Sequence, residues 1–194
     1  MRLVIGITGA SGAIYGLRLL EVLHGRPGLE TYLIVSATAR QILPRETGRN
    51  LPQVEALASH SFSDADLASP LASGSFPTDG MVVAPCSIKT LSALAHSYSD
   101  TLIARAGDVT LKERRRLILL VRETPLHAGH LRLMLALAEL GAVILPPVPA
   151  FYGHPQSVDD IVNHTIGRVL DQLGLEHSLY RPWLGWDAEP PPAR

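Results

Sequence analysis

Short apolar runs alternate with longer segments of helical periodicity along this 194-residue sequence, and no other feature limits the possible folds as much. The apolar runs, typical of buried strands, cover residues 3–8, 31–35, 81–84, 117–121 and 142–145. The helical segments cover residues 13–24, 37 onward, 87–96, 127–140 and 157–173. This alternation predicts a mostly parallel sheet with helices on both faces, a doubly wound α/β fold of the Rossmann-like or flavodoxin-like kind.

The end of this pattern suggests where the domain stops. Ser157 and Asp160 have the spacing of a capping box at the start of the last helix, and Gly174 is placed to end it. We therefore expect one α/β domain over residues 1–175. The remaining residues, 176–194, close with "DAEPPPAR" and predict a C-terminal extension that is partly mobile.

Two segments inside the domain interrupt the alternation. Pro44 should bend or end the second helix, because proline lacks the backbone N–H that a helix interior needs. Residues 49–79 have mainly loop chemistry, with at most a short helix at their start. The sequence therefore predicts five strands in the whole domain, and no regular element in most of residues 49–79.

Composition argues against several classes of partner. A formal net charge of −1 gives no electrostatic reason for binding nucleic acid or an anionic membrane, and no apolar stretch approaches the ~20 residues of a membrane span. The single cysteine, Cys86, cannot form an intrachain disulfide, which fits a reducing compartment such as the cytoplasm. Charged residues make up 18% of the chain, below the usual value of about 25%, which indicates a homo-oligomer that buries surface between copies.

The segment "GITGASGAIYG" follows the first predicted strand, at the edge where parallel sheets bind ligands. Its glycines suit a tight turn that directs amides at an anion, and Ser11 adds a hydroxyl. A dinucleotide site would carry an acidic residue at the end of the second strand, where this chain has Val35 and Ser36. The Walker pattern is also absent, so the segment predicts an anion site without specifying the nucleotide.

A second loop at the same edge, "APCSIKT", follows the third predicted strand. Ser87, Lys89 and Thr90 bring hydroxyls and a cation to a helix start, which favours binding of a phosphate or a polyol. Taken singly, Ser87 would be an ordinary helix cap and Thr90 a surface residue. For Cys86, a packed core position is favoured over a role as nucleophile.

A third cluster carries charge around the fourth predicted strand. Arg105 and Lys112 precede the strand, while Arg122 and Glu123 lie at its carboxyl end, a costly place for charge unless a ligand needs it. Lys89 and Lys112 are the only lysines in a chain whose other basic residues are all arginine, which suggests a need for a compact ammonium group. The alternative is a solvated charge run, to which the arginines at 114–116 could belong.

His127 and His130 are the remaining candidates for chemistry. Their i, i+3 spacing could place both rings on one helix face. Two histidines without a nearby third ligand more often cap and pack a helix than bind zinc, so no metal is expected.

Six blocks of sequence, in register and without a large insertion, together resemble the flavin prenyltransferase family known as UbiX. They span roughly residues 1–175 and read "GITGASGAIYG", "APCSIKTLSA", "RAGDVTLKERR", "RETPLHAGHLRLM", "GAVILPPVPAFY" and "HPQSVDDIV". Gly107, Gly153 and Pro44 depart from the usual family pattern. The resemblance implies a flavin-binding domain. It also implies an enzyme that transfers a dimethylallyl group from dimethylallyl monophosphate to N5 and C6 of reduced FMN.

The same resemblance assigns residues to FMN and to the prenyl donor. The residues implied for FMN come from the two loops and the end of the fourth predicted strand: Gly9, Ala10, Ser11, Ser36, Ser87, Ile88, Lys89, Thr90 and Arg122. The residues implied for the donor phosphate are Arg105, Lys112, Tyr152 and Arg168.

Catalytic roles are implied for four residues. Glu123 is expected to act as the acid for the leaving phosphate, with Lys112 as a cationic clamp. Ser11, relayed to Glu46, is expected to remove a proton from the flavin ring. The flavin itself, or Trp183 or Trp186, could stabilise an allylic cation.

The family also implies partners. Its members build sites at subunit interfaces within dodecamers, and the product serves UbiD-type decarboxylases. Two alternatives stay open: a flavin-dependent decarboxylase acting on an aromatic acid or a peptidyl cysteine, and a non-catalytic flavin carrier. The group of Lys112, Arg122, Tyr152 and Arg168 favours a phosphate-bearing substrate.

Overall fold

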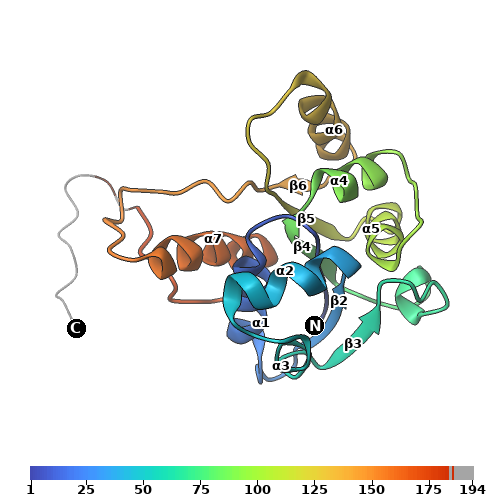
Figure 1. The fold of residues 1–194 in the computed structure, drawn as a ribbon, viewed down its shortest axis with the longest axis horizontal. Coiled ribbons are helices and arrows are strands. Elements are labelled where there is room, and N and C mark those ends of the chain that lie inside the picture. The colour runs from blue at the N-terminus through green and yellow to red at the C-terminus, as the bar shows by residue number, and fades with distance from the viewer. Residues whose placement is uncertain (184, 186–194) are drawn as a thin grey trace. The chain divides into compact units, whose positions relative to one another are not determined.

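Six strands form one all-parallel sheet in the order β3-β2-β1-β4-β5-β6 (Figure 1). In the computed structural model, which describes residues 1–183 and 185, the strands are β1 (Arg2–Ile7), β2 (Glu30–Val35), β3 (His60–Ser63), β4 (Gly80–Cys86), β5 (Arg116–Val121) and β6 (Val143–Ile144). The register pairs Ile5 with Leu33 of β2 and with Val82 of β4. The doubly wound α/β fold expected from the alternation is confirmed.

Helices connect the strands. They are α1 (Ala13–Leu23), α2 (Ala37–Thr47), α3 (Leu51–Glu55), the 3₁₀ turn η1 (Pro70–Ala72), α4 (Ile88–Ala95), α5 (Leu102–Lys112), α6 (Ala128–Glu139) and α7 (Val158–Leu173). Strand order runs outward from β1 in one direction and from β4 in the other. Because crossovers are right-handed, α1 covers one face of the sheet, and the helices between β4 and β6 cover the other.

The sheet is stabilised by wholly buried side chains along its central strands. Leu3, Ile5 and Ile7 of β1 have no exposed surface, and each such side chain contributes about 1.5–3 kcal/mol on burial. Helix α1 lies very close to β4 at Gly16, where a Cβ would be 2.4 Å from the carbonyl oxygen of Ala84. Glycine at this position therefore lets α1 approach the carboxyl ends of β1 and β4.

Three sequence expectations about this unit are wrong. Helix α2 continues through Pro44 to Thr47, with the amide of Gly48 donating to the Pro44 carbonyl at 3.0 Å. Residues 49–79 contain, besides the short helix α3 at their start, the unexpected elements β3 and η1, so the sheet has six strands rather than five. Helix α5 lies in the charged cluster before β5, where no helix was expected.

The described chain comprises two compact units, Met1–Pro147 and a second from Val148 onward. The second unit contains α7, which begins at the expected capping box of Ser157 and Asp160 and ends at Gly174 with a left-handed φ of 69°. The domain boundary expected at residue 175 stays a prediction. Within the expected extension, residues 184 and 186–194, which include Trp186, lie outside the described residues. Within residues 1–183 and 185, no helix is both long and apolar enough to cross a membrane.

Candidate functional site

Thr8 joins the two loops that the sequence places at the carboxyl edge of the sheet. Its buried hydroxyl donates to the carbonyl of Pro85 at 2.7 Å and accepts from the amide of Ser87 at 2.8 Å. Its own amide donates to the same Pro85 carbonyl at 3.3 Å. Because both loops depend on this one side chain, Thr8 fixes the spacing between Gly9 and Ser87. Thr8 was not predicted as a site residue, although a threonine at the end of an otherwise apolar strand was a usable signal.

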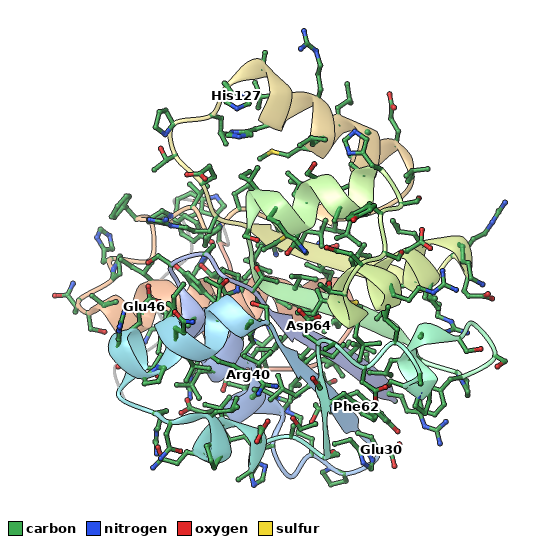
Figure 2. All side chains as sticks on the ribbon, turned by 45° about the vertical axis from the view of Figure 1, so that its right-hand side comes forward. Glu30, Arg40, Glu46, Phe62, Asp64 and His127 are labelled. Atoms are coloured by element: carbon green, nitrogen blue, oxygen red, sulfur yellow. The ribbon has the colours of Figure 1, made fainter. Side chains whose placement is uncertain are left out.

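Glu46 supplies the anion at the start of α1. Its carboxylate accepts hydrogen bonds from the amides of Gly12 at 2.8 Å and Ala13 at 2.9 Å, and from the Ser11 side chain. Figure 2 shows Glu46 near the end of α2. The turn after β1 therefore has the predicted anion-binding geometry, and at this helix start the anion belongs to the chain itself.

Glu46 is ionised at neutral pH. Burial opposes its charge, but the hydrogen bonds from Ser11, Gly12 and Ala13, together with the nearby charge of Arg122, outweigh burial and lower its pKa. The structure thus brings Ser11, Glu46 and Arg122 together at the end of the sheet. Helix α2 continues through Pro44 and carries Glu46 two residues beyond the proline.

A hollow of about 310 Å³ lies at the same edge of the sheet, and three helices begin at its wall. The lining residues come from the starts of α2, α4 and α5, with one glycine and one aspartate between them: Ser36, Ala37, Thr38, Ser87, Lys89, Thr90, Thr101, Ile103, Gly9 and Asp64. The positive ends of helix dipoles favour an anion. Three such ends around one hollow are a suitable place for a phosphate group.

The hydroxyls at these helix starts are caps. Ser36 accepts from the amide of Ala39 at 3.2 Å, Ser87 from that of Thr90 at 3.3 Å, and Thr101 from that of Ala104 at 3.3 Å. Each cap satisfies an amide in the first turn. The first two amides of α2 and α4 have no partner within their helices and can face a ligand. Those of α5, Leu102 and Ile103, instead donate to the carbonyl and the carboxylate of Asp64 at 2.7 and 2.9 Å.

Lys89 and Asp64 add charge to the hollow. The Lys89 ammonium lies 3.2 Å from a carboxylate oxygen of Asp100, and its side chain is 61% exposed. Asp64 accepts from the Ile103 amide at 2.9 Å, at the start of α5. Asp64 and Thr101 were not predicted, because they follow the part of the chain whose elements the sequence did not reveal. Figure 2 labels Asp64.

Cys86 is a core residue, as expected. Its thiol is fully buried at the end of β4, and burial raises its pKa to about 12. A thiol in this state is not a nucleophile near neutral pH.

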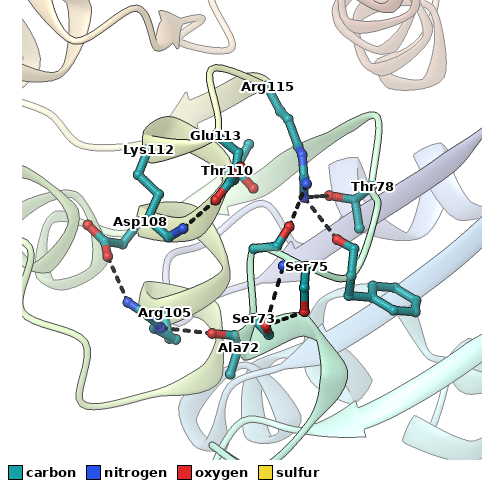
Figure 3. Close-up of polar contacts among 12 residues, drawn as sticks. Ala72, Ser73, Ser75, Thr78, Arg105, Asp108, Thr110, Lys112, Glu113 and Arg115 are labelled. Carbon is teal, nitrogen blue, oxygen red and sulfur yellow. Dashed lines mark hydrogen bonds and ion pairs between the residues drawn. The ribbon is translucent and has the colours of Figure 1, made fainter.

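Arg105 and Arg115 are tied to the segment that follows η1 (Figure 3). Arg105 donates to the Ala72 carbonyl at 3.0 Å and pairs with Asp108 at 3.0 Å. Arg115 donates to the Gly74 carbonyl at 2.8 Å and the Phe76 carbonyl at 3.0 Å. These contacts give both arginines a structural role within one chain.

Lys112 is far from the hollow in the same unit. It is the last residue of α5. Lys112 lies ten residues after Leu102, which corresponds to about 15 Å along the helix axis. The start of α5 meets Asp64 at the carboxyl edge of the sheet, whereas Lys112 lies just before Arg116, which begins β5 at the opposite edge. Lys112 pairs with Glu113. One copy of the chain therefore does not bring Lys112 to the hollow.

The remaining predicted residues of the first unit lie in the two loops or directly after β5. Arg122 and Glu123 directly follow β5, and both are exposed. The Arg122 amide donates to the Cys86 carbonyl at 3.1 Å, which places it beside the second loop. Ala10 and Ile88 are partly buried within the two loops.

His127 caps a helix, as expected. Its Nδ1 accepts from the amides of Gly129 and His130 at the start of α6, and the two histidine rings lie 3.5 Å apart. Within residues 1–183 and 185, no three His, Cys, Asp or Glu side chains gather where they could hold a metal ion.

The second unit contains Tyr152 and Arg168. A hydrogen bond of 2.9 Å joins the Tyr152 hydroxyl to Nε2 of His164. Arg168 pairs with Asp171 at 2.6 Å. Trp183 is partly exposed, and its ring meets that of Tyr152 edge to face at 5.7 Å.

Comparison with known proteins identifies a family and close relatives. The flavoprotein family matches residues 1–170. A protein of Escherichia coli (strain K12) named flavin prenyltransferase UbiX is 58% identical over 186 residues, which are 95% of this chain and 98% of that protein.

Two solved structures also resemble this chain over most of its length. A dodecameric FMN-dependent UbiX-like decarboxylase from Escherichia coli O157:H7 superposes with a TM-score of 0.94 at 50% identity, covering 95% of this chain and all of the other. AnUbiX in complex with FMN and dimethylallyl pyrophosphate superposes with a TM-score of 0.93 at 46% identity, covering 96% of this chain and 98% of the other.

Proposed function

Because the chain belongs to the UbiX family of flavin prenyltransferases, we propose that it transfers a dimethylallyl group from dimethylallyl monophosphate to reduced FMN. Bonds form at N5 and C6 of the flavin, and phosphate leaves. The reduced flavin supplies the nucleophile and retains the new ring. UbiD-type decarboxylases are the proposed users of the product, and the cytoplasm is the proposed location.

The observation that carries this proposal is the hollow bounded by the starts of α2, α4 and α5, at the same edge of the sheet as the Ser11–Glu46 pair. The starts of α2 and α4 supply amides and positive dipole ends for the FMN phosphate. Glycine is needed at position 9, because a Cβ there would be 2.6 Å from Cβ of Thr38. The residues present therefore fit a flavin mononucleotide, held by Gly9, Ala10, Ser36, Ser87, Ile88, Lys89, Thr90 and Arg122.

Ser11 and Glu46 supply a route for the proton released when the second bond closes. The Ser11 hydroxyl hydrogen-bonds to the Glu46 carboxylate, and the lowered pKa of Glu46 keeps that carboxylate ready to accept a proton at neutral pH. The amides of Gly12 and Ala13 hold the carboxylate in place.

The donor phosphate requires cations and an acid. We assign Arg105, Lys112, Tyr152 and Arg168 to the phosphate and Glu123 to proton donation. Because Lys112 lies at the opposite edge of the sheet from the hollow, we propose that Lys112 of another copy completes the site. The similarity to a dodecameric relative supports an assembly in which copies share sites.

The function is tested by mixing the protein anaerobically with reduced FMN and dimethylallyl monophosphate and weighing the extracted flavin. We expect a gain of one five-carbon unit. Bound FMN without that gain would reject the proposal. A parallel reaction with dimethylallyl diphosphate identifies the donor, since AnUbiX was crystallised with the pyrophosphate.

A second candidate function is a flavin-dependent decarboxylase, as the similar protein from Escherichia coli O157:H7 is named. Release of carbon dioxide from an aromatic acid by the flavin-loaded protein alone would favour it. The set of phosphate-binding cations favours prenyl transfer, because a carboxylate substrate needs fewer of them.

A further inference from the structure

Tyr152 and His164 form a hydrogen-bonded pair in the second unit. The hydroxyl and Nε2 are 2.9 Å apart, and the two rings meet edge to face with centroids 5.7 Å apart. Both side chains line a pocket of about 250 Å³, together with His154, Tyr180 and Arg181. The pocket has room for a phosphate group, and Tyr152 is 44% exposed, so a ligand can reach its hydroxyl.

The His164 ring also packs against Tyr180. The two rings lie 4.7 Å apart, and the Tyr180 hydroxyl donates to Asp171. Tyr180 can lie against α7 because Gly167 has no side chain, since a Cβ there would be 2.4 Å from Cδ1 of Tyr180. The orientation of His164 toward Tyr152 is therefore fixed by packing.

Arg168 belongs to the same network. Its Nη1 donates to Asp171 at 2.6 Å and to the Tyr180 hydroxyl at 3.2 Å. Asp171 also meets Nε2 of the buried His177 at 2.9 Å. Tyr152 and Arg168, two of the four side chains assigned to the donor phosphate, are thus each held by partners that contact one another through the His164 and Tyr180 rings.

The position of one proton decides what Tyr152 can offer to an anion. If Nε2 of His164 accepts the phenol proton, the phenol oxygen presents only lone pairs and repels a phosphate. If Nε2 carries a proton, it donates to the phenol oxygen, and the phenol proton is free to donate to a phosphate oxygen. Only the second arrangement makes Tyr152 a phosphate ligand.

The surroundings keep free His164 uncharged near neutral pH. Burial lowers its pKa, and the charge of Arg168 lowers it further, while Asp171 raises it in part. The titratable and charged groups that face the ring or line the pocket beside it are Tyr152, Tyr180, Arg168, Asp171, His154, Asp160 and Arg181. A phosphate dianion in the pocket would favour a proton on His164.

We propose that His164 is a positioning residue that directs the Tyr152 hydroxyl to the phosphate of the prenyl donor by donating a hydrogen bond from Nε2. The proposal rests on the proposed function, in that the phosphate belongs to the donor. His164 does not touch the donor, and it acts through Tyr152.

Matched variants test this role. His164→Gln places an amide nitrogen near the position of Nε2 and donates without titrating, whereas His164→Asn holds its amide too near the backbone to reach Tyr152. We expect His164→Asn to raise KM for dimethylallyl monophosphate about tenfold with kcat little changed, from loss of one hydrogen bond to a charged ligand. His164→Gln should keep the wild-type KM and lose the His164-dependent part of the pH profile of kcat/KM.

A double-mutant cycle separates positioning from general damage. Tyr152→Phe should raise KM to a similar extent, and Tyr152→Phe with His164→Asn should be no worse than Tyr152→Phe alone. Additive effects, or a His164→Gln variant as weak as His164→Asn, would overturn the proposal. Thermal unfolding of each variant shows whether it is folded.

Binding of inorganic phosphate, followed by calorimetry between pH 6 and 8, keeps this test separate from the proposed function. If the wild type forms no prenylated flavin but phosphate binding shows the same cycle, the prenyl transfer is wrong and His164 still orients Tyr152. If prenyl transfer occurs and the cycle is additive, only the positioning role is wrong.

Discussion

The residues assigned to the flavin and the residues assigned to the prenyl donor are organised differently in one copy of the chain. The flavin side is complete within Met1–Pro147. Thr8 joins its two loops, Glu46 caps its first helix, and three helix starts bound one hollow. On the donor side, Lys112 lies at the opposite edge of the same sheet, and Tyr152 and Arg168 belong to the second compact unit.

The difference shows which part of the site a single chain can prearrange. Ligand-binding loops at the switch point between β1 and β4 are fixed by the sheet itself. Cations that would repel one another when crowded are instead paired with their own carboxylates, as Arg105 is with Asp108 and Lys112 with Glu113. We infer that assembly and donor binding bring these groups to the phosphate, so changes on the two sides should have separable effects.

The two lysines give the largest contrast. Lys112→Ala should slow formation of prenylated flavin by about 10²–10³-fold, because it removes a cation from the leaving phosphate, while FMN binding stays unchanged. Lys89→Ala should weaken FMN binding a few-fold and leave turnover at saturating FMN intact. Flavin fluorescence titration and product mass measure the two effects. Loss of FMN binding in Lys112→Ala would contradict the division into two sides.

Glu123 should affect only the chemical step. Glu123→Gln keeps shape and removes the acid, so turnover should fall about 10²-fold while FMN binding is retained. Single-turnover kinetics at saturating donor measure the change. Unchanged turnover would remove Glu123 as the acid.

Thr8 should affect only the flavin side. Thr8→Val leaves the Pro85 carbonyl and the Ser87 amide without the hydroxyl, and we expect FMN affinity to fall about tenfold because a buried partner is lost. Thr8→Ser is the matched control and should restore most of the affinity. Equal affinity in Thr8→Val would mean that the loops keep their spacing without this side chain.

The contribution of Glu46 to stability should be the smallest of these effects, visible as a dependence of the free energy of unfolding on pH. The pKa of Glu46 is lowered in the folded chain, so its carboxylate stabilises the fold above the unfolded pKa, and this is lost as pH falls through the folded pKa. Glu46→Gln should lower the free energy of unfolding by about 0.5–1 kcal/mol at pH 7, and the difference should vanish toward pH 3. Urea unfolding at fixed protomer concentration measures this, with Glu139→Gln, on the exposed face of α6, as control. A difference independent of pH would contradict the charge-based account.

Much of the fold follows from periodicity, and the misses have physical causes. The central strands are apolar and buried, so their runs of apolar residues predicted them. In contrast β3 is a four-residue edge strand, exposed except at Phe62, and carries no such pattern. Pro44 is tolerated in α2 because the last turn keeps other bonds, including one from the Thr47 hydroxyl to the Leu43 carbonyl at 2.7 Å.

The site was predictable where a residue type and a loop position agree. Gly9, Ser36 and Ser87 follow strand ends, so the sheet brings them together. Thr8 and Asp64 act through contacts between segments far apart in the sequence, which no local pattern reveals. Partners beyond one chain, such as the copy proposed to supply Lys112, leave no local signal either.

The most direct test of this account is complementation between two inactive variants. Copies carrying Lys112→Ala are co-expressed with copies carrying Glu123→Gln, and the mixed oligomer is assayed for prenylated flavin. If Lys112 comes from another copy, sites that combine both intact residues should form, and about a quarter of wild-type activity should return for random mixing in a symmetric assembly. Activity no higher than that of the separate variants would show that one copy supplies both residues.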